Sequence, residues 1–159
     1  MTSTPLHALG AAELGARYRS GELSPVAVVR ACLERVAAWE PRLCALYALD
    51  ADAALAQARA SEARWQRGAP LSALDGVPCT IKENIATRGV PVPLGTAATE
   101  LAPASADGPP AARLREAGAV LLAKTTMPDY GMLSSGLSSF HELARNPWNL
   151  ALTPGGSSA

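Results

Sequence analysis

The segment at residues 153–159 (TPGGSSA) places the strongest constraint on what this chain can fold into. Proline fixes one φ angle and removes a hydrogen-bond donor, and the two glycines permit angles that are closed to other residues. Two hydroxyl groups follow at once, so we interpret the segment as a turn that directs serine side chains into a cleft. Taken alone, the same composition also fits a flexible Gly/Ser linker.

A second stretch, residues 77–82 (VPCTIK), is predicted to form a short strand that ends in a lysine. Pro78 is tolerated near the start of a strand, where a missing donor costs little. Alternation places Val77, Cys79 and Ile81 on one face and Lys82 on the other. A lysine at the end of a buried strand lies where α/β proteins bind ligands, although most lysines are simply solvated in loops.

Together the two stretches resemble the amidase signature family, whose members are Ser-Ser-Lys amide hydrolases. The family pattern is Gly-Val/Ile-Pro, a short strand, Lys-Asp/Glu-Asn and, far downstream, Pro-Gly-Gly-Ser-Ser. The counterparts in this chain are residues 76–78, 82–84 and 154–158. Residues 118–128 and 145–148 also resemble the family's connecting segments, so the resemblance extends over essentially the whole chain.

The resemblance implies a catalytic role for two residues. Lys82 matches the family's base, and Ser157 matches the serine that relays a proton between that base and the nucleophile. In relatives the bridging serine follows a cis peptide bond, which here is the bond between Gly156 and Ser157. The nucleophilic serine of the family is expected beyond Ala159, so the chain holds two of three catalytic residues and is expected to be inactive alone.

Further site residues are also implied by the resemblance. These residues are expected to support the turn or to line the substrate: Gly155, Gly156 and Ser158 for the turn, and Gly131, Met132 and Leu133 for the substrate.

A lysine that acts as a base must be neutral. Free lysine titrates near 10.4, so burial away from a carboxylate has to lower its pKa. Glu83 is the next residue, but strand alternation points the side chains of Lys82 and Glu83 apart. The condition of burial can therefore still be met.

The rest of the chain predicts an α/β fold. Helices are expected over 11–20, from Ser24 to a stop at Pro41, and over 51–66. Residues 86–106 form an irregular loop, and a helix from 107 to 117 leads into a second strand at 119–124. Strand, helix and strand make one βαβ unit. We expect an incomplete domain over 1–159, the N-terminal part of the amidase signature fold: a mixed sheet covered by α-helices, with helices over 1–68 and the start of the sheet core over 69–159.

Charge and composition exclude several classes of partner. The formal net charge is zero and no block of like charges occurs, which argues against nucleic-acid binding. No apolar run approaches the roughly 20 residues that span a bilayer. The three cysteines form no Cys-x-x-Cys pair, so we interpret them as buried, reduced thiols and expect a cytoplasmic location. No cofactor and no metal site are predicted.

Two other features are interpreted conservatively. The serines of residues 134–139 are accompanied by no P-loop lysine and no acidic cluster, so their hydroxyls are expected to bind backbone near the floor of the cleft. His141, followed by Glu142, is interpreted as a surface or loop histidine, because the serine–lysine pairing already supplies a base.

These inferences favour an amidase that hydrolyses the C–N bond of a small or aryl carboxamide to a carboxylate and ammonia or an amine. The first alternative is the amidase subunit of glutamyl-tRNA amidotransferase, which works with partner subunits. Residues 127–130 (MPDY) and the departure from the Ser-Ser-Thr-Glu-Asn-Ser run of that subunit disfavour it. The second alternative is a non-catalytic remnant that binds a ligand or partner. A small amide substrate and, in the full-length protein, a homodimer are the expected partners, with no nucleic acid and no membrane.

Overall fold

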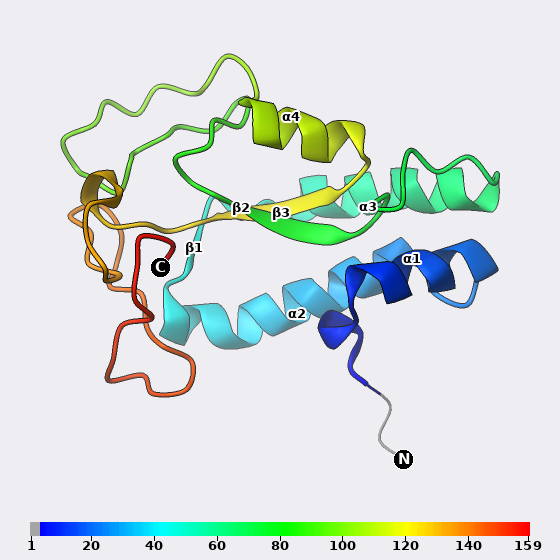
Figure 1. Ribbon diagram of the computed structural model, residues 1–159, viewed down its shortest axis with the longest axis horizontal. Coiled ribbons are helices and arrows are strands. Elements are labelled where there is room, and N and C mark those ends of the chain that lie inside the picture. Colours follow the sequence, from blue (N-terminus) through cyan, green and yellow to red (C-terminus); the bar gives the residue numbers. More distant parts are fainter. Residues whose placement is uncertain (1–3) are drawn as a thin grey trace. The chain divides into compact units, whose positions relative to one another are not determined.

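The computed structural model describes residues 4–159, and over this range three strands pair in the order β1-β3-β2 (Figure 1). The strands are β1 (Leu46–Tyr47), β2 (Pro78–Lys82) and β3 (Val120–Thr125). The predicted strands at 77–82 and 119–124 are thus confirmed to within one residue, and the α/β class with them. β1 was not predicted, because two residues carry no readable alternation.

The helices also follow the sequence pattern closely. They are η1 (Leu6–Ala8), α1 (Ala11–Ser20), α2 (Pro25–Leu43), α3 (Ala51–Gln66), α4 (Pro109–Glu116) and η2 (Asp129–Gly131), where η marks a 3-10 turn.

Side-chain caps explain two of the helix starts. The Ser24 hydroxyl accepts the backbone N–H groups of Val26 and Ala27 at the start of α2. The Asp50 carboxylate accepts the N–H of Ala53 at the start of α3. The first helix, α1, ends at Gly21, whose φ of 73° is open to glycine without strain.

One helix boundary was predicted wrongly. Pro41 was expected to close the second helix, but α2 continues through it to Leu43. Proline removes only the bond to the carbonyl four residues earlier. The last turn is still closed, because the Cys44 N–H donates to the Glu40 carbonyl at 3.0 Å.

β2 and β3 are parallel neighbours joined through α4. The Val120 N–H donates to the Val77 carbonyl at 2.9 Å, and the Glu83 N–H donates to the Thr125 carbonyl at 3.0 Å. Residue numbers rise together along both strands, so the pairing is parallel and the predicted βαβ unit is confirmed. β1 pairs antiparallel with β3, with Leu46 opposite Thr125.

The chain divides into two compact units. Unit 1 contains the described residues up to Ala37, together with Asp50–Cys79 and Arg113–Leu122. Its core is formed by Leu14, Tyr18, Val28 and Val77. Unit 2 contains Ala38–Leu49, Thr80–Ala112 and Ala123–Ala159, and it holds every residue of the predicted site.

A buried ion pair stabilises unit 1. Arg64 of α3 donates through Nε and Nη2 to the two oxygens of Asp75, at 2.7 and 2.6 Å, and the Asp75 side chain is fully buried. Burial alone raises the pKa of the Asp75 carboxyl, but the bonds from Arg64 and the Leu71 N–H hold that pKa below its ordinary value. The Asp75 carboxylate leaves room only for glycine at position 118, since a Cβ there would lie 2.6 Å from an Asp75 oxygen.

The three cysteines, Cys32, Cys44 and Cys79, are free, and they are half-buried where full burial was expected. Burial raises the pKa of the Cys79 thiol to about 11.

Within residues 4–159, every helix is too short or too polar to cross a bilayer.

We predict that Arg64→Gln lowers the free energy of unfolding by about 3–5 kcal/mol, because it leaves the Asp75 carboxylate buried without its cation. Urea denaturation at pH 7 measures this loss. Arg59→Gln is the matched control on the exposed side of α3 and is expected to change stability by less than about 0.5 kcal/mol. Because the pKa of Asp75 is lowered on folding, its contribution is complete above about pH 4 and is lost on further acidification. Equal losses in both variants would contradict the prediction.

Candidate functional site

The end of β2 meets the C-terminal segment at a lysine–serine contact. Lys82 Nζ donates to Ser157 Oγ at 2.8 Å, and both side chains are half-buried. The sequence prediction that the Lys82 amine points at the Ser157 hydroxyl is therefore confirmed. The two residues are 75 positions apart in the chain, and both belong to unit 2.

Backbone contacts fix the segment that carries Ser157. The peptide bond between Gly156 and Ser157 is cis. A Cβ on Gly156 would lie 2.5 Å from the Leu133 carbonyl oxygen and 2.7 Å from the Ser135 nitrogen, so only glycine fits there. At the chain end, the Thr126 hydroxyl donates to the Ala159 carbonyl at 3.0 Å and the Ala159 N–H donates to the Thr126 carbonyl at 3.3 Å. This end therefore lies beside the residue that follows β3 (Figure 1).

One of the three predicted substrate residues, Gly131, lies next to Ser157. A Cβ on Gly131 would be 3.6 Å from Ser157 Oγ, which places the η2 turn directly beside the hydroxyl. Tyr130 has a φ of 48° and is 58% exposed, and the Met132 side chain is 82% exposed. The structure thus brings Gly131 to the lysine–serine contact, while Met132 and Leu133 present apolar side chains to solvent. Gly155 has a φ of 102°, and Ser158 is exposed.

The serine-rich stretch mostly binds backbone, as predicted. The Ser138 hydroxyl donates to the Gly95 carbonyl and accepts the N–H groups of Phe140 and His141. Ser139 differs, because its N–H and hydroxyl both donate to the Asp129 carboxylate and so lower the pKa of that carboxyl. These bonds fix the loop and set the position of His141.

His141 was interpreted as a surface or loop histidine; it does lie in the loop after η2, but it is not at the surface. Its side chain is only 7% exposed, and its Nε2 is hydrogen-bonded to the carboxylate of Glu83, whose side chain is fully buried. The ring lies between aromatic neighbours, 4.9 Å from Phe140 and 5.4 Å from Tyr47 between centroids. A buried carboxylate costs free energy unless a hydrogen-bond donor is close to it, and the His141 ring supplies that donor.

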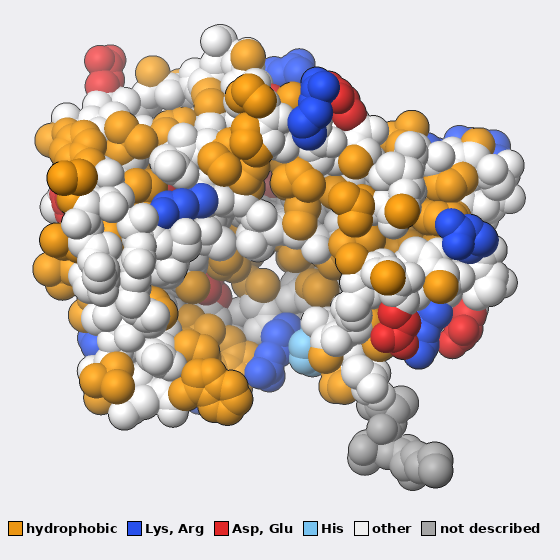
Figure 2. Space-filling view, in the orientation of Figure 1, with side chains coloured by type: hydrophobic (Ala, Val, Ile, Leu, Met, Phe, Trp, Pro, Cys, Tyr) orange, Lys and Arg blue, Asp and Glu red, His pale blue; other side chains and the backbone are white. Residues whose placement is uncertain are grey.

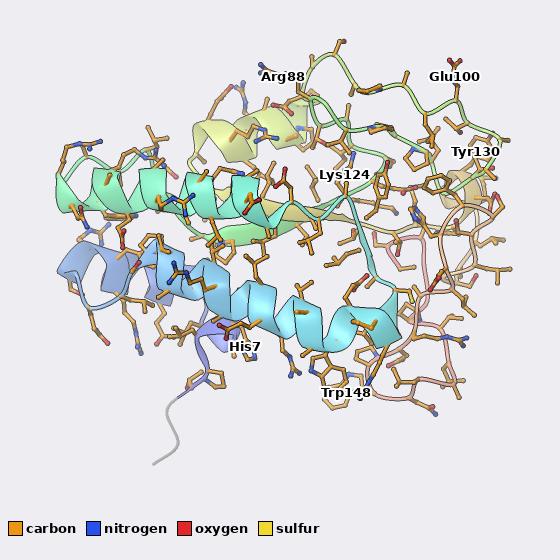
Figure 3. All side chains as sticks on the ribbon, turned by 180° about the vertical axis from the view of Figure 1, so that it is seen from behind. His7, Arg88, Glu100, Lys124, Tyr130 and Trp148 are labelled. Atoms are coloured by element: carbon orange, nitrogen blue, oxygen red, sulfur yellow. The ribbon has the colours of Figure 1, made fainter. Side chains whose placement is uncertain are left out.

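Lys124 lies on the same side of unit 2 as Glu83. Its side chain leaves β3, is 2% exposed, and donates from Nζ to the Ile85 carbonyl at 2.8 Å. Burial lowers the pKa of the Lys124 amine, and the charge of Glu83 opposes that shift. Burial also raises the pKa of the Tyr47 phenol, with a further contribution from Glu83. Figure 3 shows Lys124 among the surrounding segments of the chain, whereas Trp148, which is 95% exposed, lies at the outer edge of the view.

Sequence reasoning missed this second group of charges. One signal was available: Lys124 follows the apolar residues 119–123, and the chain contains only one other lysine. No comparable signal marks Glu83, because a carboxylate after a strand is usually solvated.

Unit 2 also exposes large hydrophobic side chains on its loops, and orange patches of this kind are visible on the face shown in Figure 2. The exposed side chains are Leu49, Leu101, Tyr130, Met132, Leu133, Leu137, Trp148, Leu150 and Leu152. Among the described residues, no group of three or more His, Cys, Asp or Glu side chains is arranged to hold a metal ion.

Comparison with known proteins identifies the family. The sequence model of the Amidase family matches residues 27–159. The chain belongs to the Amidase family. This agrees with the resemblance carried by the lysine-containing strand and the Gly-Gly-Ser-Ser turn.

Relatives of the chain include several members of this family. A glutamyl-tRNA(Gln) amidotransferase subunit of Anaeromyxobacter sp. (strain K) is 41% identical over 159 residues, which cover 98% of this chain and 32% of the relative. The corresponding protein of Chloroflexus aggregans is 39% identical and is likewise covered over 32% of its length. The chain therefore spans about a third of the length of these curated relatives.

Solved structures of Amidase family enzymes share the fold. The native peptide amidase of Stenotrophomonas maltophilia superposes with a TM-score of 0.88 at 31% identity, over 97% of this chain and 33% of that enzyme. A fatty acid amide hydrolase superposes with a TM-score of 0.91 at 28% identity, over 98% of this chain and 28% of that enzyme. The expected fold, part of the amidase signature architecture, is confirmed.

We predict that His141→Ala lowers the free energy of unfolding by about 1–3 kcal/mol, because the buried Glu83 carboxylate loses a donor. Thermal or urea unfolding at neutral pH measures the change. His7→Ala, which alters the one other histidine, is the control, since His7 is exposed on η1 and is expected to be neutral to substitution. Unchanged stability in both variants would contradict a supporting role for His141.

Proposed function

We propose that this chain supplies the base and the proton relay of an amide hydrolase that cleaves a carboxamide to a carboxylate and ammonia or an amine. The observation that carries the proposal is the 2.8 Å contact between Lys82 Nζ and Ser157 Oγ. Membership of the Amidase family supports the reaction class, and the matched peptide amidase and fatty acid amide hydrolase act on amides by name.

The geometry suits a two-step proton relay. In the neutral form, Lys82 has a lone pair that accepts the Ser157 hydroxyl proton. Ser157 in turn removes the proton of a nucleophilic hydroxyl as that group attacks the substrate carbonyl. The relay then runs in reverse and delivers the proton to the nitrogen of the leaving group. Water subsequently releases the acyl group as the carboxylate.

The nucleophile and the oxyanion donors are proposed to come from sequence outside these 159 residues. The relatives are about three times as long, so this chain accounts for a third of their length. Within the chain, Gly131 is adjacent to Ser157, and the next two residues, Met132 and Leu133, expose apolar side chains. We assign residues 131–133 to the substrate side of the site, and Gly155, Gly156 and Ser158 to the support of the turn that carries Ser157.

A second candidate function is that of the amidase component in a glutamyl-tRNA amidotransferase. The observation in its favour is the identity of 39–41% to subunits of that enzyme. Residues 127–130 (MPDY) and the serine-rich loop depart from the pattern of those subunits, which favours the free amidase. In a full-length protein that contains this chain, a substrate panel with free glutamine beside simple and aryl carboxamides separates the two, since a strict preference for glutamine favours the amidotransferase.

We predict that the 159-residue chain alone does not hydrolyse amides, because a base and a relay cannot replace a nucleophile and oxyanion donors. The assay measures ammonia or amine release from the carboxamide panel. Turnover that is abolished by both Lys82→Ala and Ser157→Ala would overturn this interpretation and make Ser157 itself the nucleophile.

Joined to the two thirds of the Stenotrophomonas maltophilia peptide amidase that it does not match, the chain is expected to hydrolyse amides. In this chimera, Lys82→Ala and Ser157→Ala should each lower kcat about 10²–10⁴-fold, the usual contribution of proton-transfer groups. Ser105→Ala, on an exposed loop, is the matched control. Retained activity in both site variants would disprove the relay, and an inactive but cooperatively folded chimera would favour the non-catalytic alternative.

A further inference from the structure

Residues 129–139 form a loop whose two ends are hydrogen-bonded to each other. The carboxylate of Asp129, at the start of the loop, accepts the backbone N–H of Ser139 at 2.9 Å and the Ser139 hydroxyl at 2.5 Å. These bonds lower the pKa of the Asp129 carboxyl, so the charged form closes the loop, and hydrogen bonds to a charged acceptor are among the stronger ones. We call these two residues the Asp129–Ser139 clasp, and the whole loop lies in unit 2.

The closed loop packs against the turn that carries Ser157. A Cβ on Gly156 would lie 2.5 Å from the Leu133 carbonyl oxygen and 2.7 Å from the backbone nitrogen of Ser135. A Cβ on Gly131 would lie 3.6 Å from Ser157 Oγ. The loop therefore approaches this turn at alternate residues, and a displacement of the loop would change the space beside the Ser157 hydroxyl.

The opposite side of the loop is bonded to a neighbouring segment that contains Leu94 and Ala97. The Tyr130 N–H donates to the Leu94 carbonyl at 2.7 Å, and the Ala97 N–H donates to Ser139 Oγ at 3.1 Å. Tyr130 and Leu94 have φ angles of 48° and 55°, which residues other than glycine keep only where their surroundings enforce them. The Ser139 hydroxyl thus links this segment to Asp129 at the start of the loop.

We propose that Asp129 and Ser139 are positioning residues that hold residues 131–133 beside the turn that carries Ser157, and so set how tightly the carboxamide substrate binds there. Both act through the backbone of the loop and not on the reacting atoms. The inference rests on the proposed function, in which residues 131–133 form the substrate side of the site.

Steady-state kinetics of a full-length protein that contains this chain test the inference, with benzamide and acetamide as substrates. Asp129→Ala removes both acceptor oxygens of the clasp. Ser139→Ala removes the hydroxyl and keeps the backbone N–H, whereas Ser139→Thr retains both donors. The matched control is Asp52→Ala, which removes an exposed carboxylate from α3 in unit 1.

Asp129→Ala is expected to raise KM about tenfold and to change kcat less than about threefold, because a displaced loop weakens the binding of substrate and transition state alike. Ser139→Ala should raise KM about threefold, since one of the two bonds remains. Ser139→Thr and Asp52→Ala should keep the native KM. Misfolding gives a different result, because it lowers the fraction of active enzyme and hence kcat, while KM stays unchanged.

Hydrogen exchange followed by mass spectrometry gives a second readout that needs no turnover. The backbone amides of residues 130–137 should exchange about tenfold faster in Asp129→Ala than in the native protein, because the loop opens more often. Native exchange rates in Asp129→Ala, or faster exchange with an unchanged KM, would overturn the inference and leave the proposed function intact.

A full-length protein that hydrolyses neither amide would contradict the proposed function instead. The inference is then decided by the dissociation constant for benzamide, measured by calorimetry, which Asp129→Ala should raise about tenfold and Ser139→Thr should leave unchanged. Benzamide that does not bind, or that binds the native protein and Asp129→Ala equally well, would refute it.

Discussion

The parallel pairing of β2 with β3 is the constraint on which the candidate site depends. Two backbone bonds, Val120 to Val77 and Glu83 to Thr125, set the register of the strands at both ends. Parallel strands end at the same edge of a sheet, and this is where α/β proteins place ligands. Lys82 and Thr126 therefore emerge together, and Thr126 binds the backbone of Ala159. The serine that Lys82 contacts is delivered by that same backbone anchor.

Two fully buried carboxylates have different roles in this chain. Asp75 is bound by both nitrogens of one arginine and by a backbone N–H, so its oxygens are well supplied with donors. Glu83 has one oxygen bound by His141 and the other unpaired, with Lys124 nearby. A buried charge that is incompletely paired costs stability, and such groups concentrate where chemistry is performed. The first carboxylate belongs to a buried ion pair of unit 1, and the second is held by His141 within unit 2.

Much of the fold was readable from local patterns. The Ser24 cap, the glycine after Ser20 and the alanine-rich run to Gln66 mark helices that the structure reproduces. The alternation along residues 77–82 predicts β2, and the apolar run along residues 119–124 predicts β3. The contact between Lys82 and Ser157 was predictable because two ordered motifs carry it. The partners of Glu83 were not, since the burial of a carboxylate depends on residues 41 and 58 positions away in the chain. β1 was missed because its two residues are fixed by Thr125 and by the Glu40 side chain, which accepts the Leu46 N–H.

The scarcity of lysine affects how a lysine-specific proteinase can cleave this protein. A lysine-specific proteinase finds only two cleavage sites in the sequence, and both lie within strands of the sheet. Cleavage requires an extended, accessible backbone, so paired strands are protected until they open. Digestion by such an enzyme therefore reports the opening of β2 and β3 alone, while the arginines on helices and loops are left uncut.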